Sequence, residues 1–384
     1  MSAPTRIAVV GGGTMGAGIA ALACRHGIAT VLCDVDEAAV DAGVRRVTDE
    51  LARRVRRGRM TTAEADATAA LLTGSADLAA VAGTGLVLEA VPEEPQLKRD
   101  LFARVARIAP AAVLASNTSS IPIATIADAV AAPERVLGLH FFNPPGAMRL
   151  VELVTTPATA ADAAATARAL AVAIGKQVVA VADGPGFLVN RCARPYYLEA
   201  LRIVETGVAT APQVDRACEA AGFPMGPFRL MDTIGIDVSL AVTRSMFEQS
   251  GGEPRWQPTL TQEVMAASGK LGRKSGSGFY DYGDDAAPDV GEHAAASAGD
   301  APALVERIVA QLVNEAWFAL DAGVARTQDD VDLAMTVGLG HPRGPFAWGR
   351  ELGLQRVVAL LGRLAGRDGD ARYRVAAGLM AAAG

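Results

Sequence analysis

The pattern of hydrophobic and polar positions changes once along the chain, near residue 183. Before that point, short apolar runs rich in β-branched residues alternate with helical stretches. The predicted strands are residues 6–10, 29–34, 85–91, 111–117, 135–142 and 176–181. Nearly continuous apolar strands are typical of a sheet covered on both faces, so this part predicts a doubly wound, mostly parallel α/β sheet. Residues 35–72 are longer than one crossover helix and predict two helices that project from the sheet domain.

After residue 183 the strand pattern stops and helices follow. Residues 187–275 predict helices separated by the turns "GFPMGPF" and "DTIGID", whereas residues 284–300 are small, polar and proline-containing, as in a linker. The predicted parts are a sheet domain at 1–183, an all-α domain at 184–283, a linker at 284–300 and a second, shorter helical domain at 301–384.

The second helical stretch repeats the first. Three segments recur in the same order at a spacing of 116 to 118 residues: Gly207-Val208-Ala209 at Gly323-Val324-Ala325, Val214-Asp215 at Val331-Asp332, and Gly226-Pro227-Phe228 at Gly344-Pro345-Phe346. An ordered series of this kind indicates an internal duplication of a helical unit. The string "VN" also recurs, which aligns Asn314 with Asn190; we expect Asn314 not to be catalytic, because the second copy has no sheet domain of its own.

Composition narrows the classes of function. The chain of 384 residues is 51% hydrophobic and 20% charged, which suits large cores and excludes general disorder. Its net charge of −6 disfavours a nucleic-acid partner, which requires a basic face. No apolar run reaches the roughly 20 residues that span a bilayer, and the four cysteines show no metal-binding spacing. These features predict a cytoplasmic protein with no bound metal and no membrane partner.

A glycine-rich turn follows the first predicted strand. Gly11, Gly13 and Gly16 form a G-x-G-x-x-G frame, in which glycine permits the tight turn, the approach of a pyrophosphate and close helix packing. The next strand ends in Asp34, where a carboxylate would hold the adenosine ribose and repel a 2′-phosphate, so NAD is favoured over NADP. The residues of this loop predicted to bind the cofactor are Gly11, Gly13, Thr14, Met15 and Gly16. FAD shares the fingerprint, but no second flavin-type segment follows; the alternative is a glycine-rich turn with Asp34 as a helix cap.

Polar residues also follow three other predicted strands, in "EAVPEEPQLK", "ASNTSSIPI" and "GLHFFNPP". Ligands of open α/β sheets bind beyond the carboxyl ends of the strands, so Asn117, Ser119 and His140 are expected to face the same crevice as the nicotinamide. Histidine suits reversible proton transfer, which the oxidation of an alcohol requires, and Glu152 could orient its ring. The alternative is a packing histidine at a strand end.

The sequence resembles the L-3-hydroxyacyl-CoA dehydrogenase family, which includes 3-hydroxybutyryl-CoA dehydrogenases. The matching segments cover residues 6 to 282 in the family's order: "GGGTMGAGIA", "EAVPEE", "ASNTSS", "GLHFFNPPGAMRLVE", "DGPGFLVNR", "GFPMGPF" and "GRKSGSGFY". The resemblance implies an NAD-binding Rossmann domain followed by the helical domain of this family.

The resemblance also implies roles for matching residues. His140 corresponds to the catalytic base and Glu152 to its partner, Ser119 contacts the substrate oxygen, and Asn190 completes the site from the first helix of the helical domain. The residues implied to contact the nicotinamide half of NAD are Glu93, Lys98 and Asn117.

The implied reaction is the reversible, NAD-dependent oxidation of a (3S)-3-hydroxyacyl-CoA to a 3-ketoacyl-CoA, as in the β-oxidation of fatty acids. The alternatives are a free 3-hydroxy acid, an acyl-carrier-protein thioester or a dicarboxylyl-CoA as substrate. A non-enzymatic NAD-binding redox sensor would not need His140, Glu152, Ser119 and Asn190 together.

The resemblance suggests an interpretation of two further features. The arginine-rich stretch at residues 45–59 is either a solvated helix face or, through Arg56, Arg57 and Arg59, a site for the phosphates of coenzyme A. Single-copy members of the family dimerise through the helical domain, so the second copy is expected to pack against residues 187–283 in place of a partner; a homo-oligomer is also possible.

Overall fold

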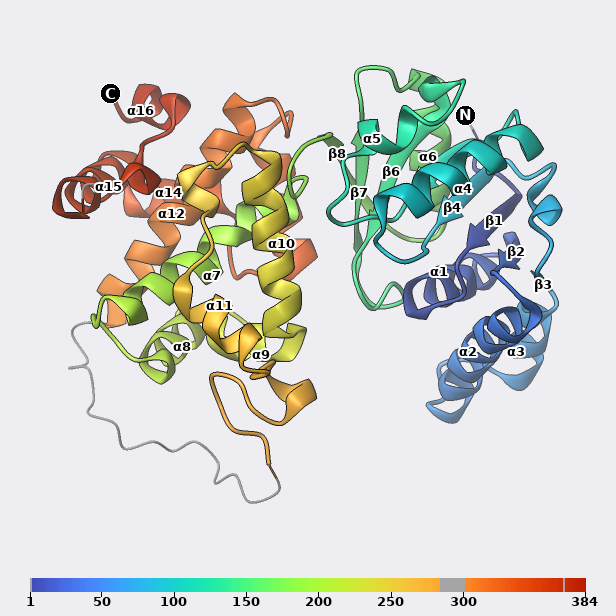
Figure 1. Ribbon diagram of the computed structural model, residues 1–384, viewed down its shortest axis with the longest axis horizontal. Helices are drawn as coiled ribbons and strands as arrows, with labels where there is room; N and C mark the ends of the chain where they lie inside the picture. The colour runs from blue at the N-terminus through green and yellow to red at the C-terminus, as the bar shows by residue number, and fades with distance from the viewer. Residues whose placement is uncertain (1, 284–300, 369) are drawn as a thin grey trace. The chain divides into compact units, whose positions relative to one another are not determined.

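The computed structural model describes residues 2–283, 301–368 and 370–384 (Figure 1). The predicted linker and its His293 therefore lie outside the described residues. The chain divides into two compact units, Met1–Phe187 and Leu188–Gly384.

The first unit contains an eight-stranded sheet with the order β3-β2-β1-β4-β5-β6-β7-β8. All neighbouring strands are parallel except β6 and β7, so the predicted doubly wound, mostly parallel fold is confirmed. The strands are β1 (Arg6–Val10), β2 (Ala29–Cys33), β3 (Leu72–Ser75), β4 (Leu86–Glu89), β5 (Val113–Ser116), β6 (Val136–Phe141), β7 (Leu150–Thr155) and β8 (Gln177–Ala182). The hydrophobic pattern missed β3, which is a half-exposed edge strand, and β7, whose apolar run is interrupted by Glu152.

The helices of this unit are α1 (Thr14–Arg25), α2 (Glu37–Arg56), α3 (Thr62–Ala69), α4 (Pro95–Ile108), α5 (Ile123–Ala127) and α6 (Ala161–Ala173). Helices α1 and α6 cover one face of the sheet and share one hydrophobic core with it. Helices α2 and α3 are the pair predicted between residues 35 and 72. Asp36 caps α2 by accepting a hydrogen bond from Ala39 N–H, and Thr61 and Glu64 form a capping box at α3.

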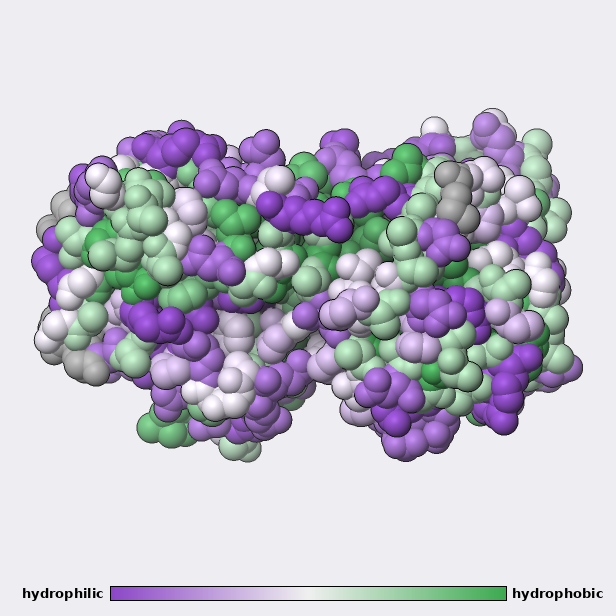
Figure 2. All heavy atoms as spheres, turned by 90° about the horizontal axis from the view of Figure 1, so that it is seen from above, coloured by the Kyte–Doolittle hydropathy of each residue, from purple (hydrophilic) through white to green (hydrophobic). Residues whose placement is uncertain are grey.

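Among its described residues, the second unit has helices and no strand. Its first copy holds α7 (Val189–Glu205), α8 (Ala211–Ala220), α9 (Pro227–Ile234), α10 (Ile236–Gln249) and α11 (Leu260–Ala267). Its second copy holds α12 (Ala301–Asp321), α13 (Gln328–Leu339), α14 (Pro345–Leu352), α15 (Leu354–Asp368) and α16 (Ala377–Ala383). On the face shown in Figure 2, hydrophilic side chains are spread widely with apolar ones between them, as expected where most large apolar residues lie in cores.

The repeated residues of the two copies make the same contacts. The Asp215 carboxylate accepts hydrogen bonds from the backbone N–H groups of Phe228 and Arg229, which open α9. Asp332 binds the N-terminus of α14 in the same way, through the N–H groups of residues 346 and 347. The glycine that precedes each proline is required because a Cβ atom there would lie 2.4 Å from Asp215 in one copy and 2.2 Å from Asp332 in the other. The duplication therefore repeats a structural unit.

Helices α7 and α12 pack against each other through two buried ion pairs. Arg191 Nε lies 2.7 Å from Glu315 Oε1, and Arg307 pairs with Glu199. At a spacing of 116 residues Arg191 corresponds to Arg307, so each pair is the counterpart of the other. The expected packing of residues 301–384 against residues 187–283 is confirmed (Figure 1).

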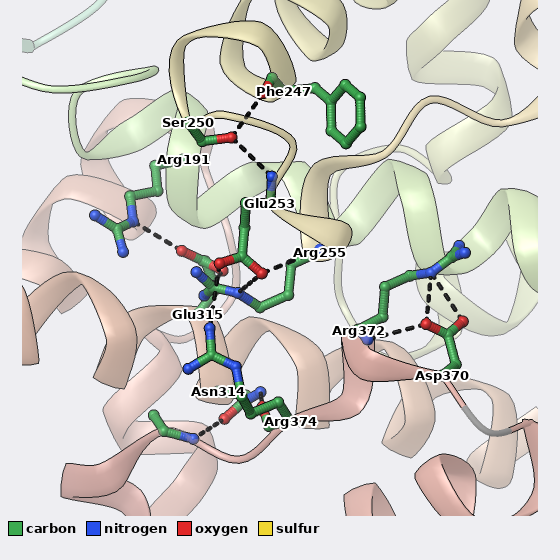
Figure 3. A network of polar contacts seen from close by, with 11 residues as sticks. Arg191, Phe247, Ser250, Glu253, Arg255, Asn314, Glu315, Asp370, Arg372 and Arg374 are labelled. Carbon is green, nitrogen blue, oxygen red and sulfur yellow. Dashed lines mark hydrogen bonds and ion pairs between the residues drawn. The ribbon is translucent and has the colours of Figure 1, made fainter.

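The same spacing corrects the alignment of Asn314 with Asn190. The counterpart of Asn190, at the start of α7, is Glu306 on α12. Asn314 is fully buried within α12, where its side chain donates to Arg374 O and accepts from Ala376 N–H (Figure 3). Its role is therefore to hold the C-terminal segment, and the recurrence of "VN" reflected local similarity only.

Removing one member of a buried pair is expected to cost more than removing both. In Arg307→Met, the Tyr373 hydroxyl is the one partner left to the Glu199 carboxylate among the described residues. Because Glu199 is 2% exposed, we expect a loss of about 3–5 kcal/mol in the free energy of unfolding. The double variant Glu199→Met/Arg307→Met should recover most of this loss, as measured by urea unfolding. Equal losses in the single and double variants would contradict this account of the interface.

Candidate active site

The glycine loop joins β1 to α1 and has two different kinds of glycine. A Cβ atom on Gly11, whose φ is +105°, would lie 2.6 Å from Ala90 O, and one on Gly16 would lie 1.8 Å from Gly11 O. A Cβ atom on Gly13 would meet nothing within 4 Å. Gly13 and Thr14 are exposed at the start of α1, where the free N–H groups and the helix dipole suit a pyrophosphate. The loop therefore fits the phosphates of a dinucleotide.

Asp34 follows β2 and holds the glycine loop. Its carboxylate accepts hydrogen bonds from Gly12 N–H at 2.6 Å and from Val35 N–H at 2.7 Å. Arg46 of α2 donates to the carbonyl of Gly12 at 3.1 Å, so both ends of this residue are bound. The cap of α2 is Asp36, so the alternative of Asp34 as a helix cap is wrong. Sequence reasoning missed Arg46, because only the fold brings α2 beside the loop.

Lys98 is at the centre of a buried polar cluster between β4 and β5. The Lys98 side chain is 1% exposed, and its ammonium group lies 2.5 Å from Glu89 Oε1 and 3.2 Å from Glu93 Oε2. Glu89 also accepts hydrogen bonds from Ser116 Oγ at 2.6 Å and from Val91 N–H at 2.7 Å. Glu89 was not predicted, although a carboxylate at the end of the apolar run "LVLE" is itself an unusual signal.

Glu93 binds the turn after β5. It accepts hydrogen bonds from Thr118 Oγ1, from Ser119 N–H at 3.1 Å, and from both the N–H and the Oγ of Ser120. Burial alone would raise its pKa, but the charge of Lys98 and the hydroxyl donors outweigh burial, so the pKa lies below its ordinary value. Glu93 therefore remains ionised and fixes the position of Ser119.

Asn117 connects the ends of β5 and β6. Its Oδ1 accepts a hydrogen bond from Phe141 N–H at 2.9 Å, next to His140. Glu93, Lys98 and Asn117 thus hold the ends of the strands in place. Their predicted contacts with nicotinamide stay predictions.

His140 and Glu152 face each other across the antiparallel pair β6 and β7. The register places them directly opposite, and His140 Nδ1 lies 2.6 Å from Glu152 Oε2. His140 is 6% exposed and Glu152 is fully buried. The rings of Phe142 and Phe187 lie 4.6 and 5.8 Å from the imidazole, between ring centroids. Because Nδ1 is held by a carboxylate, Nε2 is the ring nitrogen suited to exchange a proton.

The loop that joins β6 to β7 is held by Lys176. Its ammonium group donates to the carbonyls of Pro145 and Met148, and burial, with the nearby charge of Arg25, lowers the pKa of Lys176 to about 8. The sequence contains no local signal for this contact, because about 30 residues separate the partners.

The other residues predicted for the site are distant in sequence from His140 and Glu152. Asn190 is the second residue of α7, in the other unit. Arg56, Arg57 and Arg59 are exposed at the end of α2 and just beyond it. Arg56 also lines a groove of about 340 Å³ between α2 and α3.

A dinucleotide loop and a carboxylate-held histidine on one sheet suit an NAD-dependent oxidoreductase. The sequence matches the model of the NAD binding domain of 3-hydroxyacyl-CoA dehydrogenase over residues 6–184 and that of its C-terminal domain twice, over residues 186–282 and 304–383. The chain belongs to the 3-hydroxyacyl-CoA dehydrogenase family. The predicted family, enzyme class and cofactor, NAD, are thereby confirmed.

Three similar proteins align with different fractions of this chain. The 3-hydroxyadipyl-CoA dehydrogenase of Escherichia coli K12 is 38% identical, over 96% of this chain and 95% of that protein. The 3-hydroxybutyryl-CoA dehydrogenase of Mycobacterium tuberculosis is 45% identical over 72% of this chain and 98% of its own length. The crystal structure of a 3-hydroxybutyryl-CoA dehydrogenase from Escherichia coli K12 has a TM-score of 0.92 and 35% identity, with 98% of each chain covered.

No helix within residues 2–283, 301–368 and 370–384 is long and apolar enough to cross a bilayer. No group of three or more His, Cys, Asp or Glu side chains is arranged to hold a metal ion in that part of the chain.

Proposed function

We propose that the protein catalyses the reversible oxidation of a (3S)-3-hydroxyacyl-CoA to the 3-ketoacyl-CoA. The observation that carries the proposal is the buried pair of His140 and Glu152 on the sheet that bears the glycine loop. The glycine loop and Asp34 would hold NAD, which would supply the acceptor for a hydride from C3 of the substrate. The similar proteins are named for different 3-hydroxyacyl-CoA substrates, which supports the thioester class without selecting one acyl chain.

His140 takes the hydroxyl proton at Nε2 as the hydride leaves C3. Glu152 holds the opposite ring nitrogen and stabilises the imidazolium that forms, since two charges at 2.6 Å attract strongly in a buried place. Ser119, in the turn held by Glu93, and Asn190 are proposed to donate hydrogen bonds to the substrate oxygen. Their part in the reaction rests on the family resemblance of "ASNTSS" and "DGPGFLVNR".

The direct test compares substrates with NADH as reductant. We expect the protein to reduce acetoacetyl-CoA and longer 3-ketoacyl-CoAs, and to reduce the matching free 3-keto acids at least ~100-fold less well, because the coenzyme A moiety supplies binding energy. Equal activity on the free acids would favour the alternative of a hydroxy-acid dehydrogenase. No turnover of any of them, with NAD bound, would favour a redox sensor.

The arginines beyond α2 are proposed to bind the phosphates of coenzyme A. Among the residues that the structure describes, no carboxylate lies within ion-pair distance of Arg56, Arg57 or Arg59, whereas Arg53 and Arg54 pair with Glu50. Exposed cations without partners are available to a phosphate, and the neighbouring groove could take part of the ligand.

Charge reversal tests this assignment. Arg56→Glu/Arg57→Glu should raise the KM for CoA thioesters about 10- to 100-fold and leave the KM for short pantetheine thioesters unchanged, because only coenzyme A carries the phosphates. Arg45→Glu/Arg53→Glu, the same charge change on the same helix, is the control. Equal effects of both double variants would show that the arginines only solvate the helix.

A further inference from the structure

The first helical copy contains a buried arginine without a carboxylate partner. Arg194, on α7, is 3% exposed. The other buried arginines of this unit are each bound to the carboxylate of a glutamate. Arg191 and Arg255 bind Glu315, and Arg255 also binds Glu253 (Figure 3). Arg307 binds Glu199. In the described part of the chain, no carboxylate lies within ion-pair distance of Arg194.

The contacts of Arg194 leave most of its hydrogen-bonding capacity unused. Nη1 lies 3.4 Å from Ser239 O and 3.3 Å from Thr243 Oγ1, which are long hydrogen bonds, and the guanidinium carbon lies 5.1 Å from the centre of the Tyr197 ring. Nε has no hydrogen-bond partner among the described residues. A guanidinium group offers five N–H donors, and a buried cation is costly without an anion, so this side chain is suited to bind one.

The internal duplication shows that the helical fold does not require this polar cluster. At spacings of 116 residues on α7 and 118 on α10, the counterparts of Arg194, Tyr197, Ser239 and Thr243 are Ala310, Val313, Val357 and Leu361. All four counterparts are at most 1% exposed. The second copy therefore fills the same place with apolar side chains. The arginine and its polar neighbours are confined to the copy that directly follows the NAD-binding domain.

The internal symmetry indicates where an acyl chain would lie relative to this cluster. Arg194 follows Asn190 by one helical turn, so the two lie on the same face of α7. In the second copy, the counterparts of Asn190, Ile234 and Val238 line one groove of about 480 Å³, as Glu306, Leu352 and Arg356. The first-copy residues Ile234 and Val238 are 42% and 45% exposed, so two large apolar side chains lie at the surface in the positions equivalent to those of that groove.

We propose that Arg194 binds a carboxylate at the far end of the acyl chain and selects 3-hydroxyacyl thioesters of dicarboxylic acids. The proposal rests on the proposed function, in which Asn190 contacts the oxygen on C3. Three carbon–carbon bonds beyond C3 span roughly 4 Å, comparable to the roughly 5.4 Å of one helical turn, so a six-carbon chain suits the separation of the two residues. A guanidinium group recognises a carboxylate through two parallel hydrogen bonds, which a terminal methyl group cannot accept.

Two thioesters of equal length test the proposal: 3-oxohexanedioyl-CoA, which ends in a carboxylate, and 3-oxohexanoyl-CoA, which ends in a methyl group. With NADH, the unaltered protein should show a kcat/KM at least ~100-fold higher for the dicarboxylyl thioester. In Arg194→Met the ratio of the two values should fall by about 100-fold or more, and Arg194→Lys should restore part of it. Arg202→Met, on the same helix, is the control and should leave the ratio unchanged.

The outcomes separate this proposal from the proposed function. If the unaltered protein reduces both thioesters equally well, the role of Arg194 is overturned while the proposed function stands. The same holds if Arg194→Met lowers both values alike. If neither thioester is reduced, the proposed function itself fails. Should Arg194→Met not fold, the ratio in the unaltered protein and in Arg194→Lys still decides.

Discussion

Replacement of His140 by glutamine is expected to lower kcat for acetoacetyl-CoA reduction by at least ~10³-fold. Glutamine keeps a hydrogen-bonding side chain of similar reach but cannot exchange a proton, so the variant loses both the base of the oxidation and the acid of the reverse reaction. Binding of NADH should stay within about threefold of the unaltered protein, because the glycine loop and Asp34 lie on other strands. Steady-state kinetics and fluorescence titration of NADH measure the two effects.

Glu152→Gln is the companion variant. It keeps a hydrogen bond to Nδ1 but removes the charge that stabilises the imidazolium, so kcat should fall by about 10²-fold and the pH profile should shift. Near-normal turnover in His140→Gln would show that His140 is a packing residue, and the proposed mechanism would then be wrong.

Gly16→Ala is expected to abolish NAD binding and to destabilise the first unit. The added methyl group would lie 1.8 Å from the carbonyl oxygen of Gly11, which is backbone and cannot turn aside, so α1 must move away from β1. We expect a loss of about 3 kcal/mol in the free energy of unfolding, the range typical of overpacked cores. Thermal unfolding and NADH titration test the two parts.

Gly13→Ala is the matched control in the same loop. Its methyl group would meet no protein atom within 4 Å, so the free energy of unfolding should change by less than about 1 kcal/mol. The N–H groups of α1 remain in place, but a methyl group here would crowd the approaching pyrophosphate, so NADH binding alone should weaken. If the two variants destabilised the protein equally, close packing at Gly16 would not explain why the motif has a glycine there.

Local motifs in the sequence predicted most of the features that lie within a few residues of a strand end. The alternation of apolar runs and helices predicted a doubly wound sheet, and the G-x-G-x-x-G frame with Asp34 predicted its cofactor. Both follow from short-range requirements: periodicity of side-chain direction, and the absence of a Cβ atom in a tight turn. The repeat at 116 to 118 residues, together with the resemblance to a family whose single-copy members dimerise through the helical domain, predicted that the two helical copies pack together.

The sequence by itself determined most of the helices and strands, the glycine loop, the cofactor and the residues eligible for proton transfer. Only the tertiary structure decided which of those residues meet. His140 and Glu152 are neighbours because β7 runs antiparallel to β6, a strand that the interrupting glutamate concealed. Arg46, Glu89 and Lys176 act on partners that other elements bring to them. Such contacts depend on packing between distant segments, which local propensity and spacing do not encode.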